Sequence, residues 1–196
     1  ALPISYSVVS ILKGDNMRKG DFIYTGKEVK FYPLDPREEE ILIEDIGHAL
    51  SLTCRGNGHT NNFYSVAQHS INCAKEAKAR GYSNRVQLAC LLHDGSEAYL
   101  SDITRPVKKE LKEYLIIEDK LQNAIYKKYG IGDLTEEELN LIKNVDDSML
   151  KYEMKYLMNF HEIVGEDLVG NYSLDFVLMN EVEREFLELF DEIKIY

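Results

Sequence analysis

The chain has 196 residues, of which 44% are hydrophobic and 29% charged, and it contains only 4 prolines. This composition is typical of one globular domain and excludes both a disordered chain and a collagen-like polymer. Its 34 acidic side chains against 23 lysines and arginines give a net charge of −11, so most of the surface repels nucleic-acid polymers and anionic membranes. A small phosphorylated ligand needs only a local cationic spot and stays compatible with this charge.

The cysteines and the N-terminal segment bear on the compartment. Cys54, Cys73 and Cys90 are an odd number without a Cys-x-x-Cys pair, which argues against a disulfide framework and against a cysteine-based zinc site. We interpret all three as reduced core residues. No apolar run approaches the ~18 residues of a transmembrane helix, and no basic segment precedes the first apolar patch, which argues against a signal peptide. We therefore expect a cytoplasmic protein.

The predicted elements follow an irregular N-terminal stretch. Residues 1–27 are expected to form an N-terminal extension, and residues 28–34 can form a short extended piece. Apolar residues at helical spacing predict a helix within 37–53, followed by a loop rich in Gly and Asn. A further helix is predicted over 66–80, and Gly81 is suited to end it.

Helical patterns continue through the middle of the chain. Residues 84–100 predict a helix or a pair of helices, opened by Ser83 or Asn84 as the N-terminal cap. A longer helix is predicted to start at Pro106 and to end at Gly130.

Two more helices complete the prediction. Thr135, with a glutamate three residues later, forms a capping-box pattern ahead of a long helix over 136–157. A final acidic helix spans about 180–193, inside a C-terminal helical extension at 165–196. The sequence therefore predicts an all-α fold of about five to seven helices, in a single domain over residues 1–196.

Two adjacent aspartates of the long helix have different expected positions. Asp146 lies four residues after Ile142, on the buried face, whereas Asp147 is rotated by about 100° from it. Asp147 lies four residues from Lys143 and four from Lys151, the spacing of solvated ion pairs on a helix surface. A buried carboxylate needs a cationic partner, so Asp146 indicates a site inside the protein.

Other polar residues also interrupt the apolar stripes. Glu153, two turns further along the same helix, has two open interpretations: it orients a metal ligand, or it only bonds to a tyrosine. His93, Asp94 and Glu97 share one side of an apolar helix, and His69 lies on the inward stripe of the helix before it. A lone histidine in such a place is usually a satisfied core residue. Imidazoles and aspartates aimed inward from three helices instead form a mixed nitrogen and oxygen set, which suits Mn, Co, Fe, Ni or Mg better than a structural zinc.

Three segments of the chain resemble the HD-domain metal-dependent phosphohydrolases, in particular their 5′-deoxynucleotidase-like branch. These segments are YSVAQHS, LLHDGSEAYLSDITRPVK and KNVDDSMLKYE, and the similarity covers roughly residues 28–160. The resemblance implies the HD-domain helical bundle. It also implies one divalent ion, such as Co, Mn or Mg, with four ligands: His69, His93, Asp94 and Asp146. Histidines at the spacing of a second metal site are absent, which favours a single ion.

The resemblance also implies an activity and further site residues. The expected reaction is removal of phosphate from (deoxy)nucleoside 5′-phosphates or nucleoside-analogue phosphates, giving nucleoside and orthophosphate, with stepwise removal from di- and triphosphates left open. Glu97 and Asp102 would orient the attacking water and handle protons near the leaving oxygen. Arg55 is the first candidate for binding the phosphate, because a guanidinium can bind two of its oxygens at once, and Lys108 and His59 are weaker candidates.

Several alternatives stay open at this point. The enzyme could release tripolyphosphate from a dNTP, or cleave a cyclic or signalling nucleotide, although the missing second-metal histidines argue against a diesterase. A helical binding module with a structural metal site is a third interpretation. Gly56 occupies a position where relatives often carry an aromatic residue, so base and sugar preference are open. The expected partner is a small nucleotide, and a homodimer is expected only by analogy with relatives.

Overall fold

The computed structural model describes residues 17–163 and 165–195, and over these residues the fold is all-α apart from one small hairpin. The fold class predicted from the sequence is therefore confirmed. The helices of nine residues or more in the described part are α1 (Ile43–Leu52), α2 (Val66–Ala79), α3 (Asn84–Leu92), α6 (Lys112–Lys128), α7 (Glu136–Leu157) and α8 (Met179–Ile193).

Shorter elements connect these helices. They are the antiparallel pair β1 (Ile23–Tyr24) and β2 (Lys30–Phe31), the 3-10 turns η1 (Glu38–Glu40) and η2 (Arg55–Gly58), and the single-turn helices α4 (Glu97–Leu100) and α5 (Arg105–Lys108). The hairpin begins within the predicted N-terminal extension, of which residues 1–16 lie outside the described residues. Across the described ranges, we find no helix that is both long enough and apolar enough to cross a membrane.

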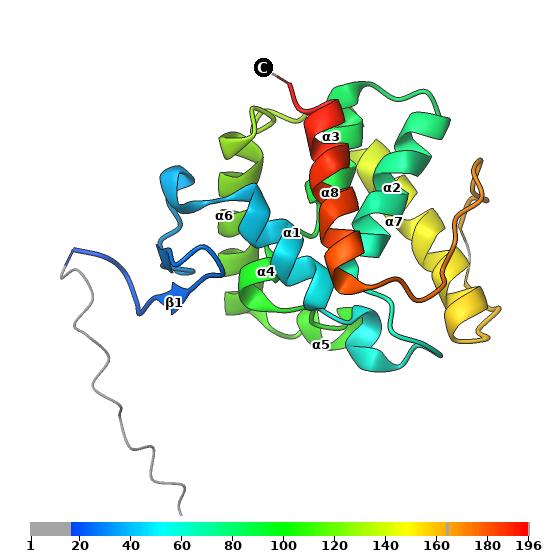
Figure 1. The fold of residues 1–196 in the computed structure, drawn as a ribbon, viewed down its shortest axis with the longest axis horizontal. Helices are drawn as coiled ribbons and strands as arrows, with labels where there is room; N and C mark the ends of the chain where they lie inside the picture. The colour runs from blue at the N-terminus through cyan, green and yellow to red at the C-terminus, as the bar shows by residue number, and fades with distance from the viewer. Residues whose placement is uncertain (1–16, 164, 196) are drawn as a thin grey trace, which may run out of the picture.

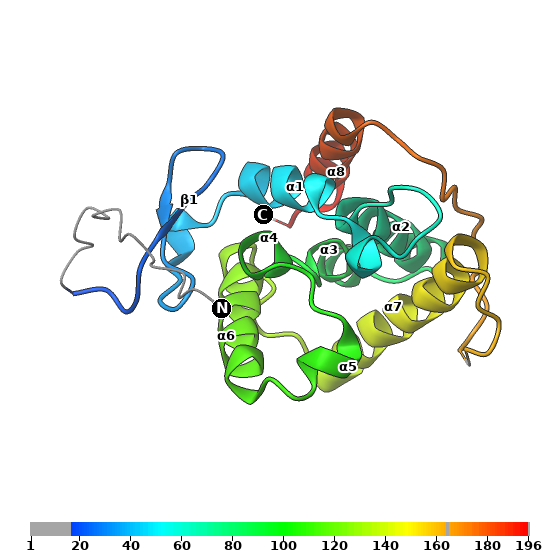
Figure 2. The ribbon, with the colours of Figure 1, turned by 90° about the horizontal axis from the view of Figure 1, so that it is seen from below.

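Helices α2 and α3 form the centre of the bundle. They pack on each other, α2 also contacts α1, α7 and α8, and α3 also contacts α6, α7 and α8. Figure 1 shows α8 beside α1 on the face toward the viewer, and Figure 2 shows the central pair lying between α1 and α8 on one side and α7 on the other. This packing brings together the first turn of α2, the C-terminal end of α3 and the middle of α7.

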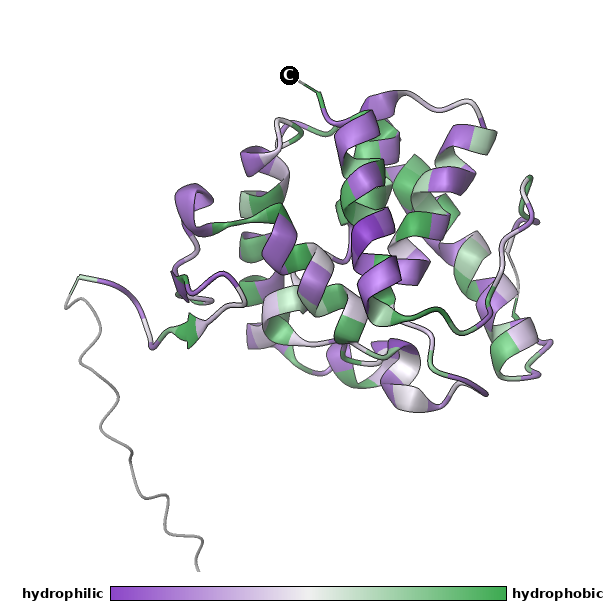
Figure 3. Cartoon of the chain, in the orientation of Figure 1, coloured by the Kyte–Doolittle hydropathy of each residue, from purple (hydrophilic) through white to green (hydrophobic). Residues whose placement is uncertain are grey.

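The C-terminal helix α8 contributes to the same core. Its inward row is buried and consists of Val182, Phe186, Leu189, Phe190 and Ile193. Phe186 lies so close to Gly47 of α1 that a Cβ added to this glycine would come within 3.0 Å of the ring. The turns of α8 that face away from the core are mostly hydrophilic (Figure 3).

Local capping signals set the starts of three helices. The Ser65 hydroxyl accepts a hydrogen bond from the Gln68 N–H at 3.1 Å, and Gln68 Oε1 accepts a hydrogen bond from the Ser65 N–H. The predicted capping box of Thr135 at α7 is present, and Ser83 caps α3. Each cap satisfies N–H groups that have no partner inside the helix.

Of the helix or pair of helices predicted over 84–100, the structure forms the pair, α3 and α4. The structure corrects two other points. His93 and Asp94 lie in the turn after α3 rather than within a helix, and Glu97 starts α4. The single helix predicted from Pro106 to Gly130 is divided into α5 and α6, because the chain leaves helical geometry at Leu111 (φ −96°, ψ 71°). No residue of α5 is buried, so no core packing holds the two pieces in one straight helix.

The three cysteines are free. Cys73 and Cys90 are buried, as predicted, whereas Cys54 is only partly buried, directly before η2. In α7, spacing predicts an inward row that runs from Leu139 to Tyr156, but these two end residues are exposed and only the middle of the row, around Val145 and Met149, is buried.

Candidate metal centre and adjoining cavity

The four predicted metal ligands lie together where α2, α3 and α7 meet. His69 is on α2, His93 and Asp94 directly follow α3, and Asp146 is on α7. His69 Nε2 lies 3.2 Å from His93 Nε2, 3.2 Å from Asp146 Oδ1 and 3.8 Å from Asp94 Oδ2. His93 Nε2 lies 3.4 Å from Asp94 Oδ2 and 3.8 Å from Asp146 Oδ1. Two nitrogens and two carboxylate oxygens thus converge on one point.

Both imidazole rings are oriented by acceptors on their far sides. His69 Nδ1 lies 2.7 Å from Glu153 Oε1, and His93 Nδ1 lies 2.7 Å from the Cys90 carbonyl oxygen. A carbonyl oxygen can only accept, so His93 donates from Nδ1, and the anionic Glu153 assigns the same tautomer to His69. The two Nε2 atoms then face each other at 3.2 Å, an arrangement that a proton, the Arg55 guanidinium or a bound cation can satisfy. Metal-binding histidines are held in this way.

Cys73 places a sulfur next to the two histidines. It lies one turn after His69 on α2, with Sγ 3.5 Å from His69 Nε2. His69, Cys73 and His93 offer ligand atoms within 4.8 Å of one another and could hold a metal ion. Burial raises the pKa of the Cys73 thiol well above its usual value, so in the metal-free protein the group is a neutral thiol and not the coordinating thiolate. The sequence placed Cys73 in the core but did not predict this contact.

The histidines and aspartates of the cluster shift each other's pKa values. Burial alone would raise the pKa of Asp146, but hydrogen bonds from His69 and His93 lower it well below its usual value. Burial alone would lower the pKa of His93, but Asp94 and Asp146 raise it to about 9. Without a metal, protonated imidazoles face the carboxylates, and these same side chains could hold a metal ion.

The Arg55 guanidinium also lies against the cluster. It reaches from η2 and donates to Asp94 Oδ2 at 3.1 Å and to Glu153 Oε2 at 3.3 Å, and Nη2 lies 3.0 Å from His69 Nε2. Glu153 is buried and contacts both His69 and Arg55. Of its two interpretations from the sequence, the structure supports the one in which Glu153 orients a candidate ligand rather than bonding a tyrosine.

Asp146 and Asp147 have different surroundings. Asp147 pairs with Lys143 one turn earlier, as the spacing predicts, whereas Lys151 pairs instead with an aspartate of the 165–178 segment. Arg105, on α5, bonds to both aspartates: Nη2 donates to Asp146 Oδ2 at 2.7 Å, and Nη1 donates to Asp147 Oδ1 at 3.0 Å. Sequence reasoning missed Arg105, and the available signal was its place directly before Pro106, three residues after Asp102.

Glu97 supplies a buried carboxyl group that is only partly satisfied. Its side chain is 4% exposed, Oε2 has no hydrogen-bond partner among the described residues, and Oε1 lies 3.5 Å from Lys108 Nζ. Burial, together with the charges of Asp94 and Asp102, raises the pKa of Glu97 to about 9. A carboxyl group with a pKa raised in this way beside charged partners is typical of residues that transfer protons.

Asp102 and the η2 loop lie side by side. Asp102 Oδ2 accepts a hydrogen bond from the Gly56 N–H at 3.2 Å. Gly56 has a φ of 60°, and Asn57 and Ser101 adopt positive φ values of 53° and 73° without being glycines. Such backbone strain persists only where surrounding contacts enforce it, so both segments are held in a defined conformation.

A cavity of about 460 Å³ adjoins the cluster, which is a size typical of small-molecule sites. It is lined by the three predicted substrate-binding residues Arg55, His59 and Lys108, and also by Asp94, Glu97, Asp102, Arg105 and Asp146. Another part of the wall is apolar and includes Ile103, Leu150, Met154, Leu157 and Met158. The cavity thus combines charged groups with an apolar surface.

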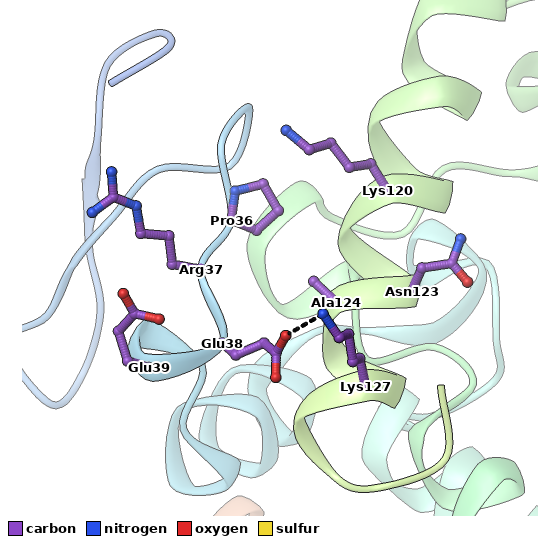
Figure 4. A pocket seen from close by; sticks show the side chains of 8 residues that line it. All are labelled: Pro36, Arg37, Glu38, Glu39, Lys120, Asn123, Ala124 and Lys127. Atoms are coloured by element: carbon purple, nitrogen blue, oxygen red, sulfur yellow. Dashed lines mark ion pairs between the residues drawn. The ribbon is translucent and has the colours of Figure 1, made fainter. Parts of the chain in front are cut away.

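A second, more open hollow of about 650 Å³ lies between α6 and the segment around η1 (Figure 4). Three of its charged groups have partners: Glu38 Oε1 lies 3.0 Å from Lys127 Nζ, and Lys120 donates to the Leu34 carbonyl oxygen. No histidine or cysteine lines it. It therefore lacks the nitrogen and sulfur donors that lie together near the smaller cavity.

Comparison with known proteins identifies two relatives. No protein-family model matches the chain. An uncharacterized protein of Rhodobacter capsulatus is 35% identical over 144 residues, which cover 70% of this chain and 73% of that protein. The uncharacterized protein YfdR of Escherichia coli is 37% identical over 110 residues, 56% of this chain, and the match spans only 59% of YfdR. The chain belongs to the same family as the R. capsulatus protein.

Proposed function

We propose that the protein is a metal-dependent phosphohydrolase of the HD-domain type. Its reaction is removal of phosphate from (deoxy)nucleoside 5′-phosphates, which gives nucleoside and orthophosphate. The observation that carries the proposal is the convergence of His69 Nε2 and His93 Nε2 with two aspartate oxygens, beside a cavity that is also lined by the partly satisfied carboxyl group of Glu97.

His69, His93, Asp94 and Asp146 would hold the divalent ion. A bound ion of this kind polarises a phosphoryl oxygen and lowers the pKa of a water molecule. The mixture of imidazole and carboxylate donors suits Co, Mn or Mg, and other first-row metals are compatible with it. Glu153 and the Cys90 carbonyl oxygen keep the two imidazoles in the orientation that ligation needs.

Cationic side chains provide the local spot that a phosphate needs on an acidic molecule. Arg55, with a side chain 15% exposed, lies against the candidate metal centre, and Lys108, 21% exposed, lies beside Glu97. His59 lines the same cavity. Phosphoryl transfer depends mainly on positioning and charge neutralisation, which Arg55 and Lys108 supply without a covalent step. The apolar wall formed by residues such as Leu150 and Met154 suits a nucleoside.

Glu97 and Asp102 are the candidates for proton transfer. Glu97 is oriented by its burial and by Lys108, and a pKa near 9 allows it to hold a proton that the leaving oxygen needs. Asp102 lines the same cavity and is fixed by the Gly56 N–H. These two carboxyl groups can therefore orient water and donate a proton on the same substrate.

A substrate panel tests this proposal. Purified protein is treated with nucleoside mono-, di- and triphosphates in the presence of Co²⁺, Mn²⁺ or Mg²⁺, and both phosphate and nucleoside are quantified. We expect metal-dependent release of orthophosphate and nucleoside from monophosphates. Tripolyphosphate as the product would instead identify a triphosphohydrolase, and absence of hydrolysis with every metal would contradict the proposal.

A variant of Glu97 tests the proposed role of this residue in the same assay. Glu97→Gln keeps the size of the side chain but cannot exchange the proton, so we expect a loss on the order of 10²-fold or more in turnover with metal binding retained. Normal turnover of this variant would remove Glu97 from the proposed chemistry.

A further inference from the structure

Arg105 contacts the candidate metal centre from the side opposite the histidines. Oδ1 of Asp146 lies 3.2 Å from His69 Nε2, whereas Oδ2 of the same carboxylate accepts a hydrogen bond from Arg105 Nη2 at 2.7 Å. Each oxygen therefore has its own partner, and rotation of the carboxylate would break the bond to Arg105. The oxygen left to a metal is Oδ1, which already points at the imidazoles.

A second carboxylate anchors the arginine itself. Arg105 Nη1 donates to Asp147 Oδ1 at 3.0 Å, and Asp147 is held in turn by Lys143 of the same helix. A planar guanidinium can span two neighbouring carboxylates in a fixed geometry, which a lysine ammonium cannot do. The Arg105 guanidinium thus holds the Asp146 carboxylate in one orientation on α7 by bonding to Asp147 on the same helix.

Core packing does not explain this contact. The Arg105 side chain is 53% exposed, and the single-turn helix α5 that carries it buries no residue. An ion pair as exposed as this one contributes little to folding stability, because water and salt screen it. Arg105 contacts one candidate ligand and lines the cavity. A role in the site therefore explains its position better than a contribution to folding stability.

We infer that Arg105 is a positioning residue that holds Asp146 in the orientation needed for metal binding. This inference rests on the metal centre proposed above. Charge alone predicts the opposite effect, because a positive side chain near a divalent cation repels it. Removal of Arg105 therefore weakens metal binding if its role is positioning, and strengthens binding if it acts only through its charge.

Calorimetric titration with Co²⁺ tests the inference on the metal-free full chain, without an activity assay. Loss of a group that orients a metal ligand typically costs 10–100-fold in affinity, so we expect a dissociation constant roughly 10–100-fold higher for Arg105→Ala. Arg105→Lys keeps the charge but not the fork, and we expect weakened binding there too. The visible absorption of the bound Co²⁺ should also change in both variants.

Lys109→Ala is the matched control. It removes an exposed positive charge directly after α5, four residues from Arg105. Metal binding by this variant should be unchanged or tighter. Wild-type affinity or tighter binding in Arg105→Ala, or wild-type affinity and spectrum in Arg105→Lys, would overturn the inference while leaving the metal centre in place. If the wild-type chain itself binds no Co²⁺, the proposed metal centre fails and the role of Arg105 fails with it. Thermal unfolding of each variant checks that the fold is retained.

Discussion

At the scale of single residues, the buried Glu97 carboxyl group opposes folding whenever it is ionised. Its side chain is 4% exposed, and one of its oxygens has no partner within the described residues. Burial and the nearby carboxylates raise its pKa from 4.5 to about 9. Between these two pH values the native state holds a proton that the unfolded state has lost, so this group makes the protein less stable as the pH rises.

Glu97→Gln removes this pH dependence. In metal-free protein at pH 8 we expect the variant to be more stable than wild type by more than ~1.4 kcal/mol, the equivalent of one unit of pKa shift. At about pH 3.5 the two proteins should be equally stable, because the carboxyl group is then largely protonated in both the folded and the unfolded state. Urea unfolding at several pH values measures the difference. If the free energies of unfolding of the two proteins change in parallel from pH 4.5 to 9, burial does not raise the pKa of Glu97 as stated.

Glu153 is expected to act through His69. Glu153→Gln retains the volume of the side chain but weakens its hold on the imidazole and on Arg55, so metal affinity should fall roughly 10–100-fold. Glu137→Gln, an exposed change on the same helix, is the control and should have no effect. Titration with Co²⁺ measures both variants. Equal affinity of Glu153→Gln and wild type would show that the contact with His69 is not needed for binding.

The sequence could predict individual faces of a helix but not the contacts between helices. Spacing placed Asp146 and Asp147 on different faces, because rotation per residue is a local property. The roles of Glu153 and Arg105 depend on which helix lies opposite, which no local pattern contains. The contact of Cys73 with the histidines was missed for a similar reason, since burial alone does not distinguish a core thiol from one beside a metal centre.

At the scale of elements, the connection between α7 and α8 is fixed by one buried carboxylate of α2. Glu76 is fully buried and accepts hydrogen bonds from the Val169 and Gly170 N–H groups at 3.0 and 3.1 Å, and from the Tyr172 hydroxyl at 2.8 Å. It also pairs with Arg80 at 2.7 Å. The segment 169–172 is thereby attached to the centre of the bundle without a helix or strand of its own.

Neutralising Glu76 should release this segment. In Glu76→Gln the side chain loses its charge and can no longer accept all of these bonds, and Arg80 is left without its buried partner. We expect a loss of about 3–5 kcal/mol in the free energy of unfolding, the usual cost of breaking a buried pair. Urea unfolding measures the loss, and hydrogen exchange should show faster exchange at 169–172. Exposed Glu188→Gln is the control, and an equally small effect of both changes would refute the role of Glu76.

Element boundaries were predictable where a local signal exists. The caps at Ser65, Ser83 and Thr135 set the starts of α2, α3 and α7. The break at Leu111 carries no glycine or proline to mark it, and it follows from the absence of core contacts in α5. A helix break caused by a lack of tertiary contacts cannot be predicted from the periodicity of the sequence alone.

At the scale of the whole molecule, α8 closes the bundle over α1 and the central pair. Phe186 is fully buried against Gly47, so Phe186→Ala should leave a cavity and reduce the free energy of unfolding by about 3–5 kcal/mol. Phe160→Ala, at a side chain that is 45% exposed, is the control and should change stability far less. Urea unfolding compares the two. Similar losses in both variants would mean that α8 is not part of the cooperative core.

The cationic side chains of the site stand out against the acidic surface of the molecule. A molecule with a net charge of −11 presents Arg55, Arg105 and Lys108 around one cavity, beside a cluster of imidazoles and carboxylates that could hold a metal ion. The central claim is that this cation is a divalent metal bound by His69, His93, Asp94 and Asp146.

X-ray diffraction from crystals grown with Co²⁺, measured at the cobalt absorption edge, tests that claim most directly. We predict one anomalous peak enclosed by the two imidazole Nε2 atoms and the two aspartate side chains. A map without a peak at this position, or a peak bound by Cys73 with Asp146 turned away from it, would contradict the account.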